Sequence, residues 1–377
     1  MVKQQETGNL SVKKEFDIKA VGKAFQIYGS YVDAWEYGSG HINDTFCVVY
    51  NQAGAIVRYI FQRINTNIFR NPVALMDNIN RVTSHIAGKM PDTPDMFRRV
   101  LKVVPSRDGD CCFRDDSGNF WRVYFFIEKA KTYDAIQLPG QAFEAAKAFG
   151  MFQRLLTDLS LPPLYETIPN FHHTPARFLA FEKALADDRC NRAASAKREI
   201  EFALGHKGIS GVLVDMQAKG DLPLRVTHND SKLNNVMLDD VTGEGICVVD
   251  LDTVMPGLTL YDFGDMVRTM TCLAAEDEKD LLNVNMMFSF FEAIVKGYLL
   301  SMSDMLSKKE TEMLAFSGKL ITFEIGLRFL TDYLDGDMYF KIHREGHNLD
   351  RCRRQFGLVK SIEEQEEKMV EFVRLSL

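Results

Sequence analysis

A polar loop framed by short apolar segments constrains this chain more than any other feature. The loop reads His-Asn-Asp-Ser-Lys-Leu-Asn-Asn over residues 228–235, and it places Asp230 two residues after a histidine and five before Asn235. A second carboxylate, Asp250, closes a later apolar run and is followed after one residue by Asp252. The apolar runs around these groups predict short strands that hold the loop rigid, at residues 224–227, 236–238 and 246–249.

The order of these groups matches the needs of phosphoryl transfer. That reaction uses one carboxylate to accept the proton of the attacking hydroxyl, and an amide oxygen and a carboxylate to hold Mg²⁺ against the nucleotide. The spacing H-x-D-x-x-x-x-N is typical of a kinase catalytic loop, with Asp230 as the base and Asn235 and Asp250 as metal ligands. A polar turn between two strands is the simpler alternative, because His, Asn, Asp and Ser are also good turn formers. The second carboxylate favours the kinase interpretation.

Composition bounds the size and the partners of the protein. A chain of 377 residues is too long for one ordinary hydrophobic core and predicts about two domains or lobes. The formal net charge of −7 and the isoelectric point near 5.7 leave no surplus of Lys and Arg for a nucleic-acid backbone, so no nucleic-acid partner is expected. The sequence does not set the oligomeric state, and a monomer is the expectation.

Three features predict a cytoplasmic protein without a membrane span. The seven cysteines are odd in number and include no C-x-x-C, a pattern that favours a reducing compartment. The first residues, Met-Val-Lys-Gln-Gln-Glu, lack the apolar core of a signal peptide. The longest apolar stretch, residues 286–300, is interrupted by Glu292 and Lys296 and is therefore interpreted as a buried helix.

The texture of the sequence changes once, near residue 130. Residues 20–127 predict one helix at 72–85 and strands at 34–37, 45–50, 56–64, 99–104 and 121–127, whereas apolar residues recur at helical spacing from residue 135 onward. The pattern predicts an α+β, two-lobed, protein-kinase-like fold. Residues 1–128 would form a small antiparallel sheet lobe with one helix that binds nucleotide, and residues 129–377 a larger, mainly helical catalytic lobe. Glu128 would lie at the hinge and is a candidate nucleotide-binding residue.

A glycine-containing turn between two predicted strands is the candidate phosphate loop. Residues 37–46 read Tyr-Gly-Ser-Gly-His-Ile-Asn-Asp-Thr-Phe, and Gly38 and Gly40 would let backbone N–H groups approach phosphate oxygens without a Cβ in the way. An ordinary hairpin turn is the alternative, since G-x-G alone is a weak signal. The position of the turn upstream of the catalytic loop favours the nucleotide-binding interpretation. No G-x-x-x-x-G-K-[ST] occurs, so the chain is not a P-loop enzyme.

Five segments carry a resemblance to a known family, and together they extend from about residue 20 to the C-terminus. They are residues 37–69, 171–178, 225–235, 249–265 and 328–340. The chain closely resembles the bacterial N-acetylhexosamine 1-kinases, which belong to the aminoglycoside phosphotransferase and choline kinase superfamily. The catalytic motif is specific to the superfamily only. The blocks Gly-x-Gly-His-Ile-Asn and Arg-Phe-Leu-x-Asp-Tyr-Leu-x-Gly-Asp are narrower pointers to the sugar 1-kinases.

The resemblance implies an ATP- and Mg²⁺-dependent kinase that phosphorylates the 1-hydroxyl of N-acetylglucosamine or N-acetylgalactosamine. Asp230 matches the catalytic base, which also contacts the sugar, and Asn235 and Asp250 match the Mg²⁺ ligands. The implied substrate is thus a small-molecule sugar.

The resemblance also implies sugar contacts from His41, Arg328 and Tyr339. Guanidinium and imidazole groups suit vicinal hydroxyls and an acetamide carbonyl, and an aromatic ring can cover an apolar face of the sugar. An ion pair of Arg328 with Glu324 or Asp332, four residues away on a helix, is the structural alternative.

One departure from the general kinase pattern concerns the third strand. Kinases carry a lysine there to hold the α/β-phosphates, whereas residues 58–64 read Arg-Tyr-Ile-Phe-Gln-Arg-Ile. The sugar kinases that the chain resembles also show Gln-Arg at this place. Arg63 is the candidate for the phosphate contact, with Gln62 as the alternative. No glutamate stands at the matching helix position, where Asp77 could serve.

Three functions from different classes remain open on the sequence. The chain is an anomeric sugar kinase, a kinase of the same fold for an aminoglycoside, choline or homoserine, or a catalytically silent nucleotide or sugar sensor. The joint presence of the base and both metal ligands argues against the sensor. The lack of an obvious acidic cluster near the C-terminus argues against a polycationic substrate, although Asp332, Asp335 and Asp337 keep it open.

Overall fold

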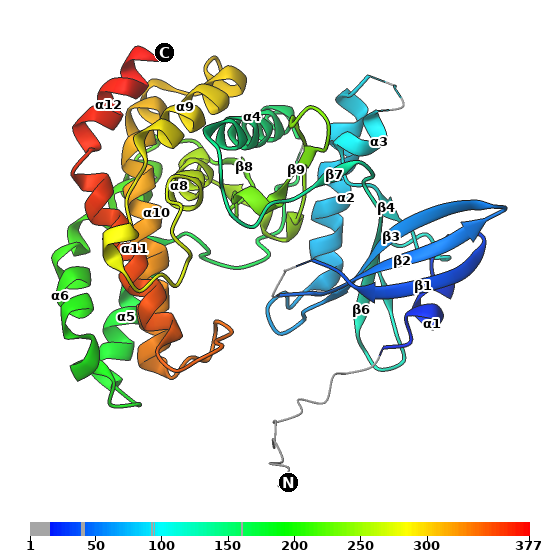
Figure 1. The fold of residues 1–377 in the computed structure, drawn as a ribbon, viewed down its shortest axis with the longest axis horizontal. Coiled ribbons are helices and arrows are strands. Elements are labelled where there is room, and N and C mark those ends of the chain that lie inside the picture. Colours follow the sequence, from blue (N-terminus) through cyan, green and yellow to red (C-terminus); the bar gives the residue numbers. More distant parts are fainter. Residues whose placement is uncertain (1–15, 39–41, 92, 94, 160) are drawn as a thin grey trace, which may run out of the picture.

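The computed structural model describes residues 16–38, 42–91, 93, 95–159 and 161–377, and it shows a sheet lobe beside a larger helical lobe (Figure 1). The sheet is antiparallel, with strand order β1-β2-β3-β6-β4 and with β5 paired to β6. Its strands are β1 (Ser30–Glu36), β2 (Asp44–Gln52), β3 (Ala55–Ile64), β4 (Val103–Val104), β5 (Phe113–Arg114) and β6 (Phe120–Phe125). The lobe also contains α1 (Ile18–Lys23), α2 (Pro72–Lys89) and α3 (Met96–Arg99).

Local sequence explains the two main elements of the sheet lobe. Ala53 and Gly54 both have positive φ, of 53° and 98°, and so form the tight turn that joins β2 to β3. Helix α2 begins after Asn71, whose side chain accepts the N–H of Ala74 at 3.1 Å and caps the helix. The helix buries one face at helical spacing, formed by Leu75, Met76, Ile79 and Val82.

The second lobe is built mainly of helices. These are α4 (Pro139–Leu155), α5 (Thr174–Asp187), α6 (Lys197–Gly205), α7 (Val212–Ala218), α8 (Thr259–Met270), α9 (Phe288–Met302), α10 (Lys308–Asp335), α11 (His347–Glu363) and α12 (Glu366–Leu375). One small sheet joins β7 (Ala130–Lys131), β9 (Val236–Asp239) and β10 (Gly245–Val248), and another joins β8 (Arg225–Thr227) to β11 (Met255–Gly257). Short 3₁₀ turns are η1 (Ala193–Ala196), η2 (Lys207–Ile209), η3 (Leu233–Asn235), η4 (Leu251–Thr253) and η5 (Leu281–Asn283).

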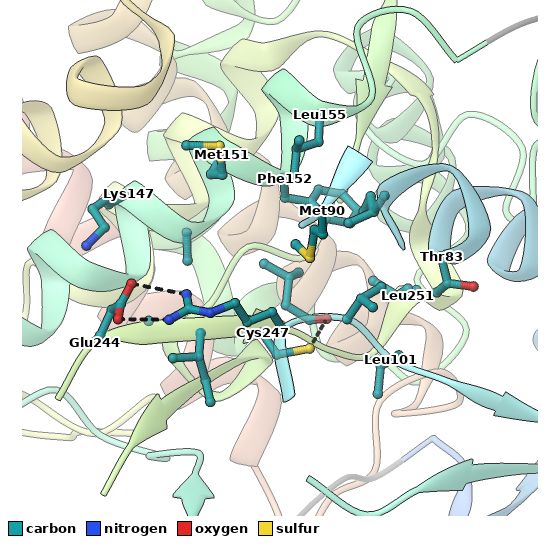
Figure 2. A pocket seen from close by; sticks show the side chains of 17 residues that line it. Thr83, Met90, Leu101, Lys147, Met151, Phe152, Leu155, Glu244, Cys247 and Leu251 are labelled. Atoms are coloured by element: carbon teal, nitrogen blue, oxygen red, sulfur yellow. Dashed lines mark hydrogen bonds and ion pairs between the residues drawn. The ribbon is translucent and has the colours of Figure 1, made fainter. Parts of the chain in front are cut away.

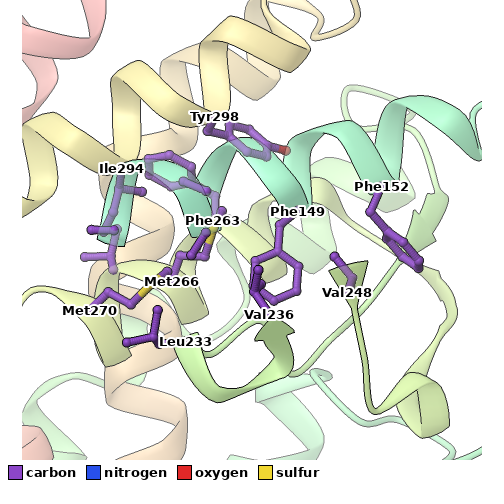
Figure 3. Close-up of a cluster of buried hydrophobic side chains, with 14 of the residues drawn as sticks. Phe149, Phe152, Leu233, Val236, Val248, Phe263, Met266, Met270, Ile294 and Tyr298 are labelled. Atoms are coloured by element: carbon purple, nitrogen blue, oxygen red, sulfur yellow. The ribbon is translucent and has the colours of Figure 1, made fainter. Parts of the chain in front are cut away.

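Close packing of α4 against α9 forms the centre of the helical lobe. A Cβ on Gly297 would lie 2.2 Å from the carbonyl oxygen of Phe143, so only glycine permits this approach of the two helices. Large side chains fill the layer between these helices, α8 and the strands that carry the catalytic loop; Phe149, Phe263 and Tyr298 are among them (Figure 3). The catalytic loop therefore rests on a rigid apolar base.

The predicted fold class is confirmed, and most predicted elements are found. The strand predicted at 99–104 is wrong in its first part, because Arg99 ends α3 and only Val103 and Val104 pair with β6. The apolar stretch at 286–300 is a helix, α9, packed against α4. Across the described ranges, no helix combines the length and the apolarity needed to cross a membrane. The division at residue 128 stays a prediction.

Candidate active site

A buried carboxylate from α8 holds the backbone of the predicted catalytic loop. Asp262 accepts the N–H groups of His228 and Asn229, at 2.9 and 2.6 Å, and the side-chain amide of Gln153 at 2.6 Å. Asn229 has a φ of 65°, a conformation rare for a residue other than glycine. The two bonds to Asp262 hold the chain in this turn and aim the next residue, Asp230, out of the loop.

Replacing Asp262 with alanine should lower the free energy of unfolding by about 2–6 kcal/mol, because two buried N–H groups would lose their acceptor at roughly 1–3 kcal/mol each. Urea unfolding followed by circular dichroism measures this loss. Asp116→Ala, which truncates an exposed aspartate in a turn, is the matched control and should change stability by less than about 0.5 kcal/mol. An Asp262→Ala protein as stable as this control would contradict the role given to Asp262.

His228 connects the loop to the segment that carries Asp250. Its Nδ1 accepts the N–H of Asp230 at 3.3 Å, and its Nε2 donates to the carbonyl of Val249 at 2.9 Å. The ring is fully buried and meets the edge of Phe149 at a centroid distance of 5.3 Å. This pattern of one accepted and one donated hydrogen bond fits a neutral imidazole with its proton on Nε2. His228 therefore sets the distance between the two polar segments.

Asp230 is ionised and partly exposed to solvent. Its side chain is 26% exposed, and one carboxylate oxygen accepts from Lys232 Nζ at 2.8 Å and from Asn235 Nδ2 at 3.1 Å. Burial acts to raise the pKa of Asp230, but the charge and hydrogen bond of Lys232 outweigh it and hold the pKa at about 2. The group is thus a carboxylate at neutral pH, able to accept a hydrogen bond and then a proton.

Asn235 and Asp250 present oxygens of the type that Mg²⁺ prefers. The side-chain NH₂ of Asn235 donates to Asp230, to its backbone carbonyl at 2.8 Å as well as to its carboxylate, which orients the amide and leaves its oxygen for another group. The backbone of Asn235 accepts the N–H of Val249 at 2.9 Å, so the two segments adjoin. An amide oxygen beside a carboxylate fits a hard divalent cation.

Asp250 feels the negative charge of two other carboxylates, Asp252 and Asp230. It adopts a left-handed conformation with a φ of 59°, and the residue is exposed. Desolvation of its carboxyl group by the surrounding protein raises the pKa of Asp250, and the carboxylates of Asp252 and Asp230 add to this effect and bring the pKa to about 6. A divalent cation would relieve the same repulsion, which supports the fit of a metal to these residues.

Unlike Asp250, Asp252 uses both carboxylate oxygens to accept hydrogen bonds from residues of the sheet lobe. It is buried; Arg122 donates to one oxygen, and Asn43 Nδ2 donates to the other at 2.7 Å. Arg122 comes from β6 and Asn43 from the segment before β2. Arg122 was not predicted from the sequence. The available signal was one arginine inside the apolar strand Phe-Trp-Arg-Val-Tyr-Phe.

The two candidates on β3 point to different surroundings. Arg63 donates to Asp44 at 2.6 Å, and its guanidinium lies 5.1 Å from the ring centre of Phe16. Gln62 accepts from Arg122 Nε at 2.9 Å. Because neighbouring residues of a strand face opposite sides, the geometry favours Gln62 over Arg63 as the residue on the side of Asp252.

Helix α2 offers no carboxylate to this cluster. Asp77 is exposed and lies 3.9 Å from Arg81, one turn along the same helix. The residue that meets Arg122 is Met76, whose sulfur lies 3.9 Å from Arg122 Nη1.

Around the hinge, an aromatic and charged group surrounds Glu128. Arg58 donates to the Glu128 carboxylate at 3.0 Å and lies 3.9 Å from the ring centre of Phe126, which also contacts Tyr37. The backbone carbonyl of Glu128 accepts from Arg98 at 3.0 Å. A contact of Glu128 with nucleotide stays a prediction.

For the glycine turn, the structure describes only part of the prediction. Gly38 has a φ of 82°, which favours glycine, and lies in open space. Gly40 and His41 lie outside the described residues.

Arg328 lies among aromatic rings rather than beside a carboxylate. Its guanidinium lies 5.1, 5.8 and 5.5 Å from the ring centres of Phe171, Tyr339 and Phe340. Tyr339 is 54% exposed and therefore available to a ligand. The ion pairs considered as an alternative are not formed, since Asp332 accepts backbone N–H groups of residues 338–340 and Glu324 accepts from His172 and Thr174.

A model of the phosphotransferase enzyme family matches residues 34–282, more than half of the chain. The chain belongs to this family.

Solved structures of other phosphotransferases share the two-lobed fold. An aminoglycoside phosphotransferase from Alicyclobacillus acidocaldarius is 12% identical with a TM-score of 0.56, and the match covers 95% of each chain. A choline kinase from Cryptosporidium parvum is 14% identical with a TM-score of 0.53, over 92% of this chain and 93% of that one. A spectinomycin phosphotransferase in complex with ADP and spectinomycin is 12% identical with a TM-score of 0.50, over 90% and 93%.

In this phosphotransferase, His172 joins the Arg328 region to the catalytic loop. Its Nδ1 bonds to Glu324 at 2.7 Å, and its Nε2 donates to the carbonyl of Asn229 at 2.9 Å. Burial acts to lower the pKa of His172, but Glu324 and the Asn229 carbonyl outweigh it and raise the pKa. His172 thus has a structural role, since it links α10 to the backbone of the predicted catalytic loop.

The phosphotransferase also contains a cavity of about 170 Å³ behind the hinge, between α2, α4 and β10 (Figure 2). Arg99 and Glu244 pair at its border, both at 3.2 Å. Cys247 lines it, and burial raises the pKa of this thiol to about 12, so the thiol is unreactive. Its lining includes neither Asp230 nor the metal-ligand candidates.

Proposed function

We propose that this phosphotransferase is an ATP- and Mg²⁺-dependent kinase that phosphorylates the 1-hydroxyl of N-acetylhexosamines. The observation that carries the proposal is the position of Arg328. A guanidinium held by three aromatic rings, with no hydrogen bond or ion pair to the described residues, lies one helical turn from Glu324, which is linked through His172 to the catalytic loop. Such a group suits the hydroxyls and acetamide carbonyl of a neutral sugar.

A second arginine strengthens the argument about the acceptor. Arg177 donates to the carbonyl of Phe171 through Nε and Nη2, at 3.2 and 2.8 Å. Burial lowers the pKa of Arg177, and the nearby charge of Arg328 lowers it further. Two guanidinium groups around one phenylalanine disfavour an ammonium-bearing acceptor. Aminoglycosides and choline, on which the similar enzymes act by their names, would therefore be poor substrates.

The proposed roles in the reaction follow from the geometry of the loop. Asp230 accepts a hydrogen bond from the sugar hydroxyl and takes its proton during transfer. Asn235 and Asp250 hold Mg²⁺, which neutralises the charge of the β- and γ-phosphates when bound. Lys232 keeps Asp230 ionised before the transfer, so that the carboxylate is ready to accept the proton.

For the nucleotide, we propose the space between the glycine turn and the hinge. Gly38 and Gly40 would approach the phosphates, and Tyr37, Phe126 and Glu128 would border the base. The ADP complex of the spectinomycin phosphotransferase, a protein of the same fold, supports ATP as the donor. We assign no phosphate contact to Arg63, since its guanidinium is paired with Asp44.

His41 and Tyr339 would contact the sugar beside Arg328. Seven cysteines without a disulfide support a cytoplasmic location, where ATP is available. A monomer is sufficient for this proposal, because every proposed group comes from one chain.

We expect N-acetylglucosamine and N-acetylgalactosamine both to give the 1-phosphate. Loss of the acetamide hydrogen bond should cost about 1–3 kcal/mol, which lowers kcat/KM for glucose and galactose by roughly 5- to 150-fold. ADP release with a panel of sugars and amino alcohols measures the preference. Phosphorus NMR identifies the product, because a 1-phosphate couples to the single anomeric proton and a 6-phosphate to two methylene protons.

Two outcomes would overturn this proposal in different ways. A 6-phosphate product would leave Asp230 as the base but refute the sugar 1-kinase. Faster turnover of choline or an aminoglycoside than of any sugar would refute the argument from the two arginines. ATP and sugar binding without any ADP release would instead favour a sensor.

A further inference from the structure

We propose that Arg122 of β6 is a positioning residue, which holds Asp252 and thereby the adjoining metal ligand Asp250. The inference rests on the proposed role of Asp250 toward Mg²⁺. In a general kinase the lysine of the third strand pairs with a glutamate of the neighbouring helix. Here the pair joins the sheet lobe directly to the catalytic lobe.

On the sheet side, Arg122 is fixed by its neighbours in the strands. Gln62 stands opposite Arg122 in the β3–β6 ladder and accepts from its Nε at 2.9 Å. Gln62 in turn donates to Thr45 on β2 at 3.0 Å. Arg122 is only 1% exposed, so we infer that it acts through its partner Asp252 rather than by contacting a phosphate itself.

On the side of the catalytic lobe, Asp252 is fixed at both ends. Its carboxylate accepts from Arg122 and Asn43, and its backbone carbonyl accepts from Thr167 at 2.7 Å. Asp252 belongs to η4, the 3₁₀ turn that starts directly after Asp250. The strained backbone of Asp250 is therefore held from its C-terminal side by a residue that cannot move without breaking an ion pair between the lobes.

The same carboxylate reaches the candidate phosphate loop. Asn43 follows the glycine turn, and its Oδ1 accepts the backbone N–H of Asn65 at 3.0 Å. Next along the chain, Thr253 donates to the carbonyl of His228 at 2.7 Å. One buried carboxylate thus connects the end of the glycine turn, the sheet and the metal-ligand segment, and Arg122 supplies the positive charge that keeps it there.

The first test uses Arg122→Met and measures the affinity for ADP at increasing Mg²⁺, without any acceptor. Loss of a residue that orients a metal ligand typically lowers metal affinity or activity by about 10- to 100-fold. The Mg²⁺ concentration at which the gain in ADP affinity is half complete should therefore rise by roughly 10-fold or more. Arg122→Lys, which keeps the charge, should recover part of this loss. In the kinase assay, Arg122→Met should lower kcat. The KM for the acceptor should stay within about twofold, because the substitution does not alter the proposed acceptor contacts Arg328 and Tyr339.

A neutral double variant separates this role from plain charge compensation. Arg122→Met alone leaves Asp252 as an unpaired buried charge, whereas Arg122→Met with Asp252→Asn leaves none. If the pair only stabilised the fold, the double variant would regain the parental Mg²⁺ response and turnover, and the proposal would be overturned. We expect the double variant to regain thermal stability but to keep the weak Mg²⁺ response.

Three further variants complete the test. Arg114→Met removes an exposed arginine of the same sheet and should leave the Mg²⁺ response unchanged. A shift with Arg63→Met and none with Arg122→Met would give the role to Arg63 and refute the proposal. Asp250→Ala checks the foundation: if it leaves the Mg²⁺ dependence of ADP binding intact, the metal assignment itself fails. A shift with Asp250→Ala and none with Arg122→Met would refute only the inference about Arg122.

Discussion

Replacing Asp230 with asparagine is expected to lower kcat by roughly 10²- to 10⁴-fold, the usual contribution of a general base. Asparagine has the same shape and keeps an oxygen near Lys232, but it cannot accept a proton from the hydroxyl of the acceptor. The other contacts of the loop, from His228 to Asp262, do not involve the substituted atom. Binding of ADP and the thermal midpoint should therefore stay close to those of the parent.

Turnover with the best acceptor, ADP titration and circular dichroism together measure this result. Asp240→Asn, a change of the same kind at an aspartate of the turn between β9 and β10, is the control and should retain full turnover. Activity of the Asp230→Asn protein within about threefold of the parent would remove Asp230 from the mechanism, because a lost base costs at least about 10²-fold.

The second large effect is expected at the metal site. Asp250→Ala should abolish phosphoryl transfer, because the charge of the β- and γ-phosphates would lose its counterion at the transition state. EDTA should silence the parent enzyme, and added Mg²⁺ should restore it. Asp250→Asn keeps one oxygen ligand without the charge and is expected to act between the parent and the alanine variant, with a higher Mg²⁺ requirement.

The kinetics of these variants across Mg²⁺ concentrations distinguish the metal ligand from a structural aspartate. Full transfer by the parent in EDTA, or by Asp250→Ala at any Mg²⁺ concentration, would count against the kinase mechanism as a whole. Circular dichroism of both variants excludes loss of the fold as the cause.

The catalytic loop was predictable because its information is local. Short apolar runs on either side of residues 228–235 specify strands, and the found strands β8, β9 and β10 lie within a residue or two of those predicted. The spacing of Asp230 and Asn235 is contained in one turn of chain, so no distant contact is needed to interpret it. Alternating apolar residues likewise predicted β2 and β3, and helical spacing predicted α4 and α5.

The link between the lobes was not predictable, because it depends on residues far apart in the sequence. Arg122 and Asp252 are 130 positions apart, and the sequence around either residue does not indicate that the two form a pair. Arg63 was the natural candidate on the third strand. Because neighbouring residues of a strand face opposite sides of the sheet, however, Arg63 binds Asp44 and only Gln62 binds Arg122. The first part of the strand expected at 99–104 is instead the end of α3. There Arg98 donates to the carbonyl of Glu128, and Arg99 pairs with Glu244 in the turn between β9 and β10.

Helix α10 places Glu324 and Arg328 on successive turns, and these two residues have different roles. Glu324 is tied to His172, and any change there would disturb the backbone of the catalytic loop. Arg328 lies against three aromatic rings and makes no hydrogen bond or ion pair to the described residues, so we expect its replacement to leave that loop in place. One helix therefore carries both a residue that supports the catalytic loop and a residue that we propose contacts the acceptor. If Arg328 contacts the acceptor, as we propose, substitutions at residue 328 and its aromatic neighbours should change the range of acceptors at little loss of stability, whereas substitutions at residue 324 should not be tolerated.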